Sequence, residues 1–389
     1  MTLLPVMGHD EARGTLARSH LEETFPGALL LHGPPGVGKQ RLGLWTGQLL
    51  LCSEPSEVGP CGLCRGCRQA LRLEHPDLHW FFPLSRPEGS RTPEALEAAL
   101  EAARAEAVSQ VREAPLEPME ADPPRGLYLA AVRRIRSVAL RSPTEGDRQL
   151  ILISQAEELG AQGSSPEAAN ALLKVLEEPP QGTHLVLTSS RPGQVLETIR
   201  SRTVPLHLGP VAPSHVRAFL REHAEADEEG ARKATRLAGG SIGRALRFLP
   251  TPDGALGPLE TARRTAFRIV RAALQDGPER FSLPLEFPPS GAHGLGDILD
   301  AVDLWLRDLA ATLEGDDDEA LANPDAGPAL RKLAEATGVS PSGCGQALLP
   351  VADTRRMAAG NVNPQLALAG LLADLVTALR TPNQGKASG

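Results

Sequence analysis

Short runs of consecutive apolar residues, separated by helical patterns, dominate the first half of the chain. Residues 28–31, 150–153 and 184–188 form three such runs, each bounded by turn residues. Runs of this length are typical of strands that are buried on both faces of a sheet. Because helical stretches separate them, they predict a parallel sheet with crossover helices.

One helix is predicted with particular clarity, over residues 164–178. Ser164 or Ser165 offers an N-cap, and Glu167 completes a capping box. Two prolines at 179–180 end the pattern.

The second half of the chain lacks strand patterns. From about residue 211, helical patterns continue to about residue 380, interrupted by Pro/Gly-rich stretches. We therefore expect three domains and a frayed tail: an α/β domain over 1–208, a small helical domain over 209–250 and an all-α domain over 258–380.

Residues 86–125 differ from their surroundings. They mix Pro, Glu, Ala and Arg with few large apolar side chains. A charged helix over 94–113 is one interpretation. We expect instead an exposed, partly disordered insertion between core elements.

Composition narrows the function classes. The 389-residue chain has 41% apolar and 23% charged residues, ordinary values for a globular protein. Its net charge of −8 argues against attraction of nucleic acid by the whole surface. Any work on DNA would then use a local face or an assembly. No stretch of about 18 apolar residues and no secretory signal is present, so we expect a cytoplasmic protein without a membrane partner.

A Gly-rich loop, Gly33-Pro34-Pro35-Gly36-Val37-Gly38-Lys39-Gln40, follows the first predicted strand. In a P-loop, glycines let backbone N–H groups face a phosphate, the lysine reaches the terminal phosphates, and Ser or Thr holds Mg²⁺. Gln40 occupies that hydroxyl position, and an amide is a poor Mg²⁺ ligand. A loop that keeps only the shape of a nucleotide site is the competing interpretation, so binding of ATP or ADP stays open. The candidate nucleotide-binding residues are Gly33, Gly36, Gly38 and Lys39.

The acidic residues of a P-loop ATPase are missing as well. Such enzymes carry an apolar strand that ends in Asp-Glu, for Mg²⁺ and for the activation of water. After residues 150–153 this chain has Ser154-Gln155, and Glu157 and Glu158 lie beyond the predicted strand end. Because these groups act as a unit, their joint loss predicts that the isolated chain does not hydrolyse ATP.

Four of the five cysteines lie within residues 52–67. Cys52, Cys61, Cys64 and Cys67 have the spacing of a tetrahedral structural Zn²⁺ site, and four protein ligands leave no open position for catalysis. An iron–sulfur site and free thiols are the alternatives.

Taken together, these motifs resemble the AAA+ clamp-loader family of bacterial DNA polymerase III. Four match in order: the P-loop, the cysteine cluster, Asn-Ala-Leu-Leu-Lys-Val-Leu-Glu-Glu-Pro-Pro at 170–180, and Ser201-Arg202-Thr203, whose third position is normally Cys. Residues 305–308 and 361–366 resemble the family more weakly, and Trp305 could equally be core packing. The resemblance implies an α/β AAA+ P-loop domain with a parallel sheet, a small helical lid domain and an all-α collar domain for oligomerisation.

Within the family, the ATP-hydrolysing gamma/tau type keeps the magnesium-binding residues and a sensor arginine. This chain has Gly243 at the sensor position, followed by Arg244. The losses favour the ATPase-deficient delta-prime type, and an active gamma/tau-like ATPase is the alternative. The resemblance then implies that Arg202 is an arginine finger acting in trans and that Ser201 helps to place it. A surface arginine in a solvated ion pair is the alternative for Arg202.

The resemblance also implies partners. These are gamma/tau and delta subunits in a pentameric ring, with the sliding clamp and primer–template DNA reached through the complex, as part of the polymerase III holoenzyme. A basic group could face this DNA or form a solvated helix face. It consists of Arg133, Arg134, Arg136 and Arg141.

Overall fold

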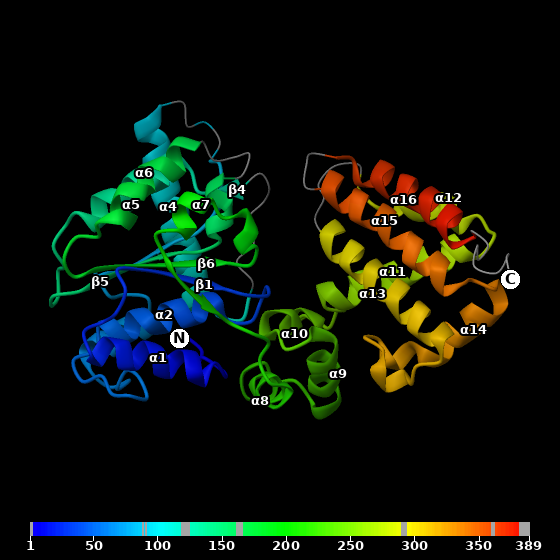
Figure 1. The fold of residues 1–389 in the computed structure, drawn as a ribbon, viewed down its shortest axis with the longest axis horizontal. Coiled ribbons are helices and arrows are strands. Elements are labelled where there is room, and N and C mark those ends of the chain that lie inside the picture. Colours follow the sequence, from blue (N-terminus) through cyan, green and yellow to red (C-terminus); the bar gives the residue numbers. More distant parts are fainter. Residues whose placement is uncertain are drawn as a thin grey trace, which may run out of the picture. The chain divides into compact units, whose positions relative to one another are not determined.

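A computed structural model describes residues 3–87, 89, 92–117, 125–160, 166–288, 294–358 and 362–380. The chain forms two compact units, Met1–Leu246 and Arg247–Gly389. The first combines a sheet with helices and the second is helical (Figure 1), which confirms the expected fold class. The expected division of the first 250 residues into an α/β domain and a lid domain stays a prediction. No described helix is long and apolar enough to cross a bilayer.

The first unit holds all the described strands. They are β1 (Ala28–His32), β2 (Leu78–Phe81), β3 (Leu84–Ser85), β4 (Arg125–Gly126), β5 (Gln149–Ile153), β6 (Thr183–Ser189) and β7 (Val204–His207). The helices up to the unit boundary are α1 (Asp10–Leu21), α2 (Lys39–Leu50), α3 (Arg65–Leu71), α4 (Pro93–Glu113), α5 (Leu129–Ala139), η1 (Ala156–Gly160), α6 (Pro166–Glu177), η2 (Pro192–Gln194), α7 (Glu197–Arg200), α8 (Pro213–His223), α9 (Glu228–Ala238) and α10 (Ile242–Phe248).

Five parallel strands form the main sheet, in the order β2-β5-β6-β1-β7. The three predicted strands are β1, β5 and β6, and the prediction of a parallel sheet is confirmed. Helix α6 corresponds to the predicted helix, although Ser164 and Ser165 lie outside the described residues. Strands β2 and β7 were not predicted. Both are edge strands, and the side chains of β7 are largely exposed, so neither needs a continuous apolar run.

The central strands contribute to two apolar cores, because successive side chains of a strand point to opposite faces. Leu29 and Leu31 of β1 pack with α1 and α2. Leu30 packs with α5 and α6 on the other face. Figure 1 shows the sheet between these two helical layers. Burial on both faces explains the uninterrupted apolar runs.

The segment expected to be an exposed insertion contains a long helix. Helix α4 spans Pro93–Glu113, and Thr92 Oγ1 caps it by accepting a hydrogen bond from Ala95 N at 3.2 Å. The expectation of disorder was wrong for these residues, because Ala-rich segments favour helix and Leu100 becomes buried. Strands β3 and β4 pair at the base, so the chain leaves and returns at one point. Residues 118–124 lie outside the described part.

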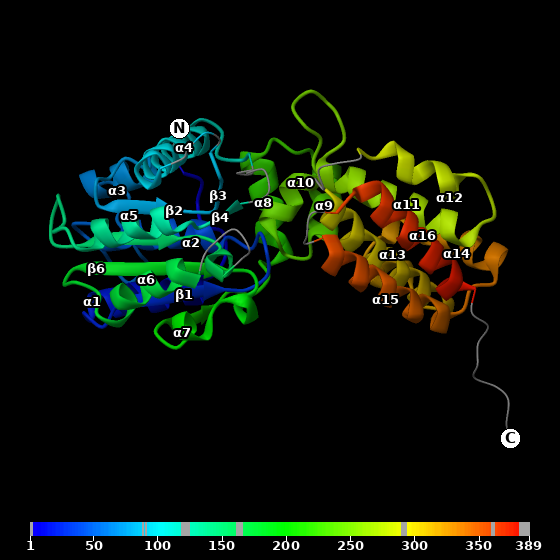
Figure 2. The same ribbon diagram turned by 90° about the horizontal axis from the view of Figure 1, so that it is seen from above.

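Helix α4 covers one edge of the main sheet (Figure 2). Arg104 Nη1 donates to the backbone oxygen of Trp80 in β2 at 3.3 Å, and Arg112 Nη2 donates to the Leu73 oxygen at 2.5 Å. The Arg104 guanidinium also lies over the Phe81 ring, at 5.1 Å from its centre. These contacts tie the helix to β2 and to the turn before it.

The second unit is a bundle around α13, against which α11, α14 and α15 pack. Figure 2 shows α16 beside α11 and α15. Its elements are α11 (Pro258–Leu274), α12 (Glu279–Ser282), η3 (Leu283–Glu286), α13 (Leu295–Glu314), η4 (Asp318–Ala320), η5 (Pro324–Ala326), α14 (Gly327–Thr337), α15 (Pro341–Ala358) and α16 (Pro364–Leu379).

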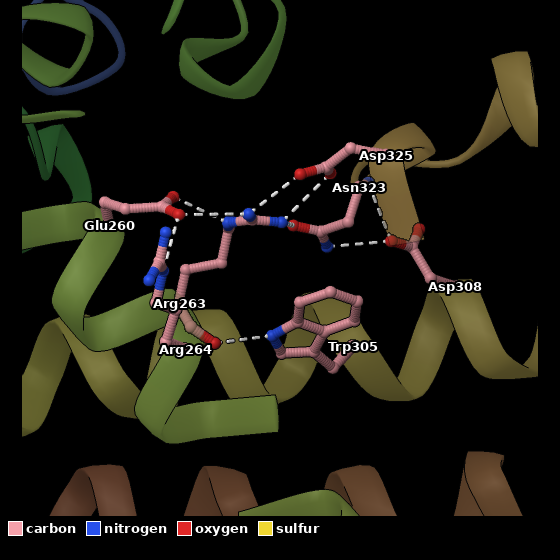
Figure 3. A network of polar contacts seen from close by, with 7 residues as sticks. All are labelled: Glu260, Arg263, Arg264, Trp305, Asp308, Asn323 and Asp325. Atoms are coloured by element: carbon pink, nitrogen blue, oxygen red, sulfur yellow. Dashed lines mark hydrogen bonds and ion pairs between the residues drawn. The ribbon is translucent and has the colours of Figure 1, made fainter. Parts of the chain in front are cut away.

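A buried polar network lies within this bundle (Figure 3). The Arg263 guanidinium donates to both carboxylate oxygens of Glu260, at 2.8 and 3.2 Å, and to both of Asp325, at 3.0 and 2.9 Å. Arg263 is 8% exposed and Glu260 is 5% exposed. A buried charge needs such partners, because an unpaired one would lose its hydration without compensation.

Two residues of the weaker sequence signature belong to the same network. Trp305 Nε1 donates to the Arg263 backbone oxygen at 2.8 Å, and Asp308 accepts from the backbone and side-chain N–H groups of Asn323, each at 2.8 Å. Both are buried. Asn363, from the second part of the signature, caps α16 by accepting from Gln365 N at 2.9 Å. Asn361 lies outside the described residues.

Candidate functional site

The glycine loop joins the end of β1 to the start of α2, as the sequence predicts. Gly36 has a φ of 74°, and a Cβ built on it would lie 2.3 Å from Ser241 Oγ. The position therefore requires glycine both for its backbone conformation and for the close approach of Ser241. Ser241 Oγ donates to the Pro35 oxygen at 3.0 Å, which fastens the loop to the segment before α10.

Lys39 is buried at the start of α2. Its ammonium group donates to the backbone oxygens of Gly33 and Pro34, at 2.9 and 2.6 Å. Burial lowers the pKa of Lys39 from 10.5 to about 8, while the negative charge of Glu157 acts in the opposite direction. Carbonyl groups of the loop itself thus accept two hydrogen bonds of the ammonium group.

The position of the missing aspartate has a different role. Ser154 is fully buried, and its Oγ accepts a hydrogen bond of 2.9 Å from Trp80 Nε1. The next residue, Gln155, has a φ of 54°, and its backbone N–H donates to Thr188 Oγ1 at 3.2 Å. Neither side chain offers a carboxylate to a metal.

A pocket of about 540 Å³ opens beside the loop. Glu157 lines it together with Lys39 and Gln155, although the sequence placed this carboxylate beyond the strand end. Its Oε1 accepts from Ser190 N at 3.1 Å, and its Oε2 has no hydrogen-bond partner among the described residues. The pocket is therefore lined by a buried carboxylate, that of Glu157, and a buried ammonium group, that of Lys39.

The start of α10 leaves little space around Gly243, the position that the resemblance gives to a sensor arginine. Gly243 N donates to the Gly36 oxygen at 3.0 Å, and a Cβ at Gly243 would lie 3.1 Å from Gly36 Cα. A side chain there would need the loop to move. The next residue, Arg244, is not one of the described residues that line the pocket.

Arg202 lies just beyond α7, away from the loop pocket. Its Nε donates to Glu177 Oε1 at 2.7 Å, and its Nη2 donates to the same oxygen. Its Nη1 donates to the Thr198 oxygen at 2.9 Å and to Ser201 Oγ at 3.3 Å. Ser201 Oγ itself donates to the Thr198 oxygen at 3.2 Å. The guanidinium is partly exposed, and all three of its nitrogens donate hydrogen bonds.

The four clustered cysteines converge on one point. Their sulfur atoms lie within 4.8 Å of one another. Cys61 and Cys67 are separated by 4.0 Å between sulfurs, and Cys64 and Cys52 by 3.9 Å. Backbone N–H groups point at these sulfurs, as from Cys61 N to Cys52 at 3.3 Å and from Cys67 N to Cys64 at 3.4 Å. Such N–H···S contacts stabilise thiolates, so the cluster could hold a metal ion.

The basic group has two exposed members. Arg133 is exposed on α5, Arg134 and Arg136 are half-buried, and Arg141 is exposed just after the helix. Arg141 Nη2 donates to Ser137 Oγ at 3.4 Å.

Comparison with known proteins finds both curated relatives and solved structures that are similar to this chain. The chain is similar to DNA polymerase III subunit delta' of Pseudomonas aeruginosa, at 31% identity over 57% of this chain and 55% of that protein. It is similar to the subunit of the same name of Escherichia coli K12, at 28% identity over 56% and 53%. The crystal structure of a DNA polymerase III gamma subunit-related protein from Thermotoga maritima is 14% identical, over 94% of this chain and 99% of that chain, with a TM-score of 0.39.

The chain spans about half the length of the curated relatives it matches. A family model described as DNA polymerase III, delta subunit, matches residues 8–212. This range contains the glycine loop, the cysteine cluster and Arg202. The chain therefore belongs to the DNA polymerase III delta subunit family.

Proposed function

We propose that this chain is a delta-prime-type subunit of the DNA polymerase III clamp loader and lends Arg202 to the ATP site of a neighbouring gamma/tau subunit. The observation that carries this proposal is the partly exposed Arg202 guanidinium, with 32% of its side chain accessible. The chain also has Gln40 and Ser154 at the positions where a P-loop ATPase has its magnesium ligands. An arginine placed in trans neutralises the charge that develops on the transferred phosphoryl group. Ser201, bonded to the same guanidinium, helps to place it.

The geometry of the glycine loop supports the absence of intrinsic ATPase activity. Lys39 is bonded to its own loop, and the Ser154 hydroxyl is bonded to Trp80. A nucleotide would have to displace the contacts of Lys39 without the help of a magnesium-binding carboxylate at residue 154. The pocket thus keeps the shape of a nucleotide site, and we propose that hydrolysis takes place only in the partner subunit.

The test reconstitutes the complex from this chain with gamma/tau and delta subunits. Arg202→Ala should leave assembly intact and slow hydrolysis at the one ATP site it serves, by roughly 10³–10⁵. Arg200→Ala is the matched control, since it removes an exposed arginine from the same helix end. Hydrolysis and clamp loading at undiminished rates in Arg202→Ala would overturn the proposal.

The competing function is an active gamma/tau-like ATPase. Glu157 favours it, because this buried carboxylate lines the same pocket as Lys39. Hydrolysis of ATP by the pure, isolated chain, abolished by Glu157→Gln, would support this alternative.

The wider role we propose is assembly of a pentameric ring through the helical second unit. Relatives named delta' support a place in this complex. The ring would hold the sliding clamp, and primer–template DNA would pass the basic group on α5. The chain itself would act as a rigid part of the loader and not as a separate enzyme.

For the cysteine cluster we propose a structural zinc ion. Four thiolates at about 2.3 Å from a tetrahedral ion lie about 3.8 Å apart. The sulfur–sulfur distances of 3.9 and 4.0 Å are close to this value. Cys52, Cys61, Cys64 and Cys67 would fill all four positions, so the ion would stabilise the module and take no part in catalysis.

A further inference from the structure

We propose that Glu177 is the positioning residue for Arg202 and sets the direction in which its guanidinium faces a neighbouring subunit. Glu177 is the last residue of α6, and Arg202 follows α7. The two residues are 25 positions apart in sequence, yet one carboxylate oxygen receives both Nε and Nη2 of the arginine. The inference rests on the function proposed for Arg202.

The contacts leave a defined part of the guanidinium free. Arginine has five N–H groups. One on Nε and one on Nη2 donate to Glu177, and the two on Nη1 donate to the Thr198 oxygen and to Ser201 Oγ. No described residue accepts the second N–H of Nη2, which remains for an incoming phosphate oxygen. Glu177 thus fixes the plane of the guanidinium and leaves one donor available.

The negative charge of Glu177 also offsets part of the positive charge of Arg202. This electrostatic effect must be compared with the effect of holding the guanidinium in place. The side chain of Glu177 is 47% exposed and that of Arg202 is 32% exposed, and water and salt screen a pair of this kind strongly. A long, otherwise mobile side chain gains more from being held in a reactive geometry, because small displacements of a catalytic group slow reactions markedly. The orienting effect therefore exceeds the electrostatic one.

This role accounts for the joint occurrence of two sequence motifs. Glu177 belongs to the string at 170–180, and Arg202 belongs to the Ser-Arg-Thr motif. The adjacent Glu178 is exposed, and it offers a matched control at the same helix end.

The experiment measures single-turnover ATP hydrolysis by the reconstituted loader on primed DNA. Arg202→Ala should remove the fast phase of one site. Glu177→Ala should slow that phase on the order of 10-fold without changing the ATP concentration for half saturation. Glu177→Gln should retain most of the rate, because an amide oxygen still accepts from Arg202. Glu178→Ala should behave as the wild type, and thermal unfolding of all variants checks the fold.

A double variant separates the two proposals. In the Arg202→Ala background, Glu177→Ala should have no further effect, since its action passes through the arginine. If Arg202→Ala slows the phase but Glu177→Ala does not, or if Glu177→Ala acts equally without the arginine, the positioning role is wrong. If Arg202→Ala itself changes nothing, the proposed function fails first.

Discussion

Trp80 and Ser154 are joined by a hydrogen bond of 2.9 Å between the indole N–H and the hydroxyl, where β2 and β5 end side by side. In a P-loop ATPase of the resembled family, the residue at position 154 would be a magnesium-binding aspartate. Here the same position stabilises the protein interior. The residue at this position therefore makes a structural contact.

Ser154→Ala should destabilise the protein by about 1–3 kcal/mol, because it leaves the buried Trp80 N–H without an acceptor. Urea unfolding followed by tryptophan fluorescence measures the change. Ser214→Ala, at an exposed serine, is the control and should stay within about 0.5 kcal/mol of the wild type. An equal effect of the two substitutions would contradict the structural role of Ser154.

Lys39 should make the free energy of unfolding depend on pH. Its pKa is about 8 in the folded chain and near 10.5 when unfolded. Between these values the unfolded state binds more protons, so stability contributed by this residue rises with pH. Relative to Lys39→Met, the wild type should gain about 2 kcal/mol between pH 8 and pH 10. A difference that stays constant over this range would show that burial does not shift the pKa.

Removal of metal should unfold the cysteine module. Cys61→Ser should lose bound metal and lower the thermal stability, because three thiolates hold an ion less tightly than four. Atomic emission measures the metal content, and calorimetry measures the thermal stability. Cys344→Ala, in the core of the second unit, should keep the full metal content. Metal retained in Cys61→Ser would mean that this residue is not a ligand.

The buried network of the second unit gives a prediction of stability. Arg263→Ala should destabilise by about 3–5 kcal/mol, because Glu260 would lose its main buried partner. Arg264 also bonds Glu260, at 2.9 Å, but 59% of its side chain is exposed. Arg264→Ala should therefore change stability by at most about 1 kcal/mol. Guanidinium chloride unfolding of both variants provides the comparison.

The elements that the sequence predicted are those with a clear local pattern of residues. Strands β1, β5 and β6 are buried on both faces, and their apolar runs are continuous. Edge strand β7 carries no such run, and α4 is made of small and charged residues whose burial depends on a neighbour. Strand β7 was therefore not predicted, and a charged helix over 94–113 was only one of two interpretations for the segment that forms α4.

The candidate site shows the same division. The glycine loop and the cysteine cluster are local motifs, and their residues lie together as their spacing predicts. The approach of Glu157 to Lys39, the bond from Trp80 to Ser154 and the pairing of Glu177 with Arg202 join residues that are distant in sequence. No local pattern predicts such contacts, because the folded sheet and its crossover helices create them.

Helix α4 has a consequence for the behaviour of the newly made chain. An exposed edge strand presents unpaired backbone groups on which a strand of another molecule can add. Arg104 of α4 donates a hydrogen bond to the Trp80 carbonyl of edge strand β2, and the helix lies along this border of the sheet. Helix α4 precedes β5, the neighbour of β2 in the sheet, along the chain. The cover is therefore already synthesised when the sheet forms, and it can keep this border from pairing with another chain.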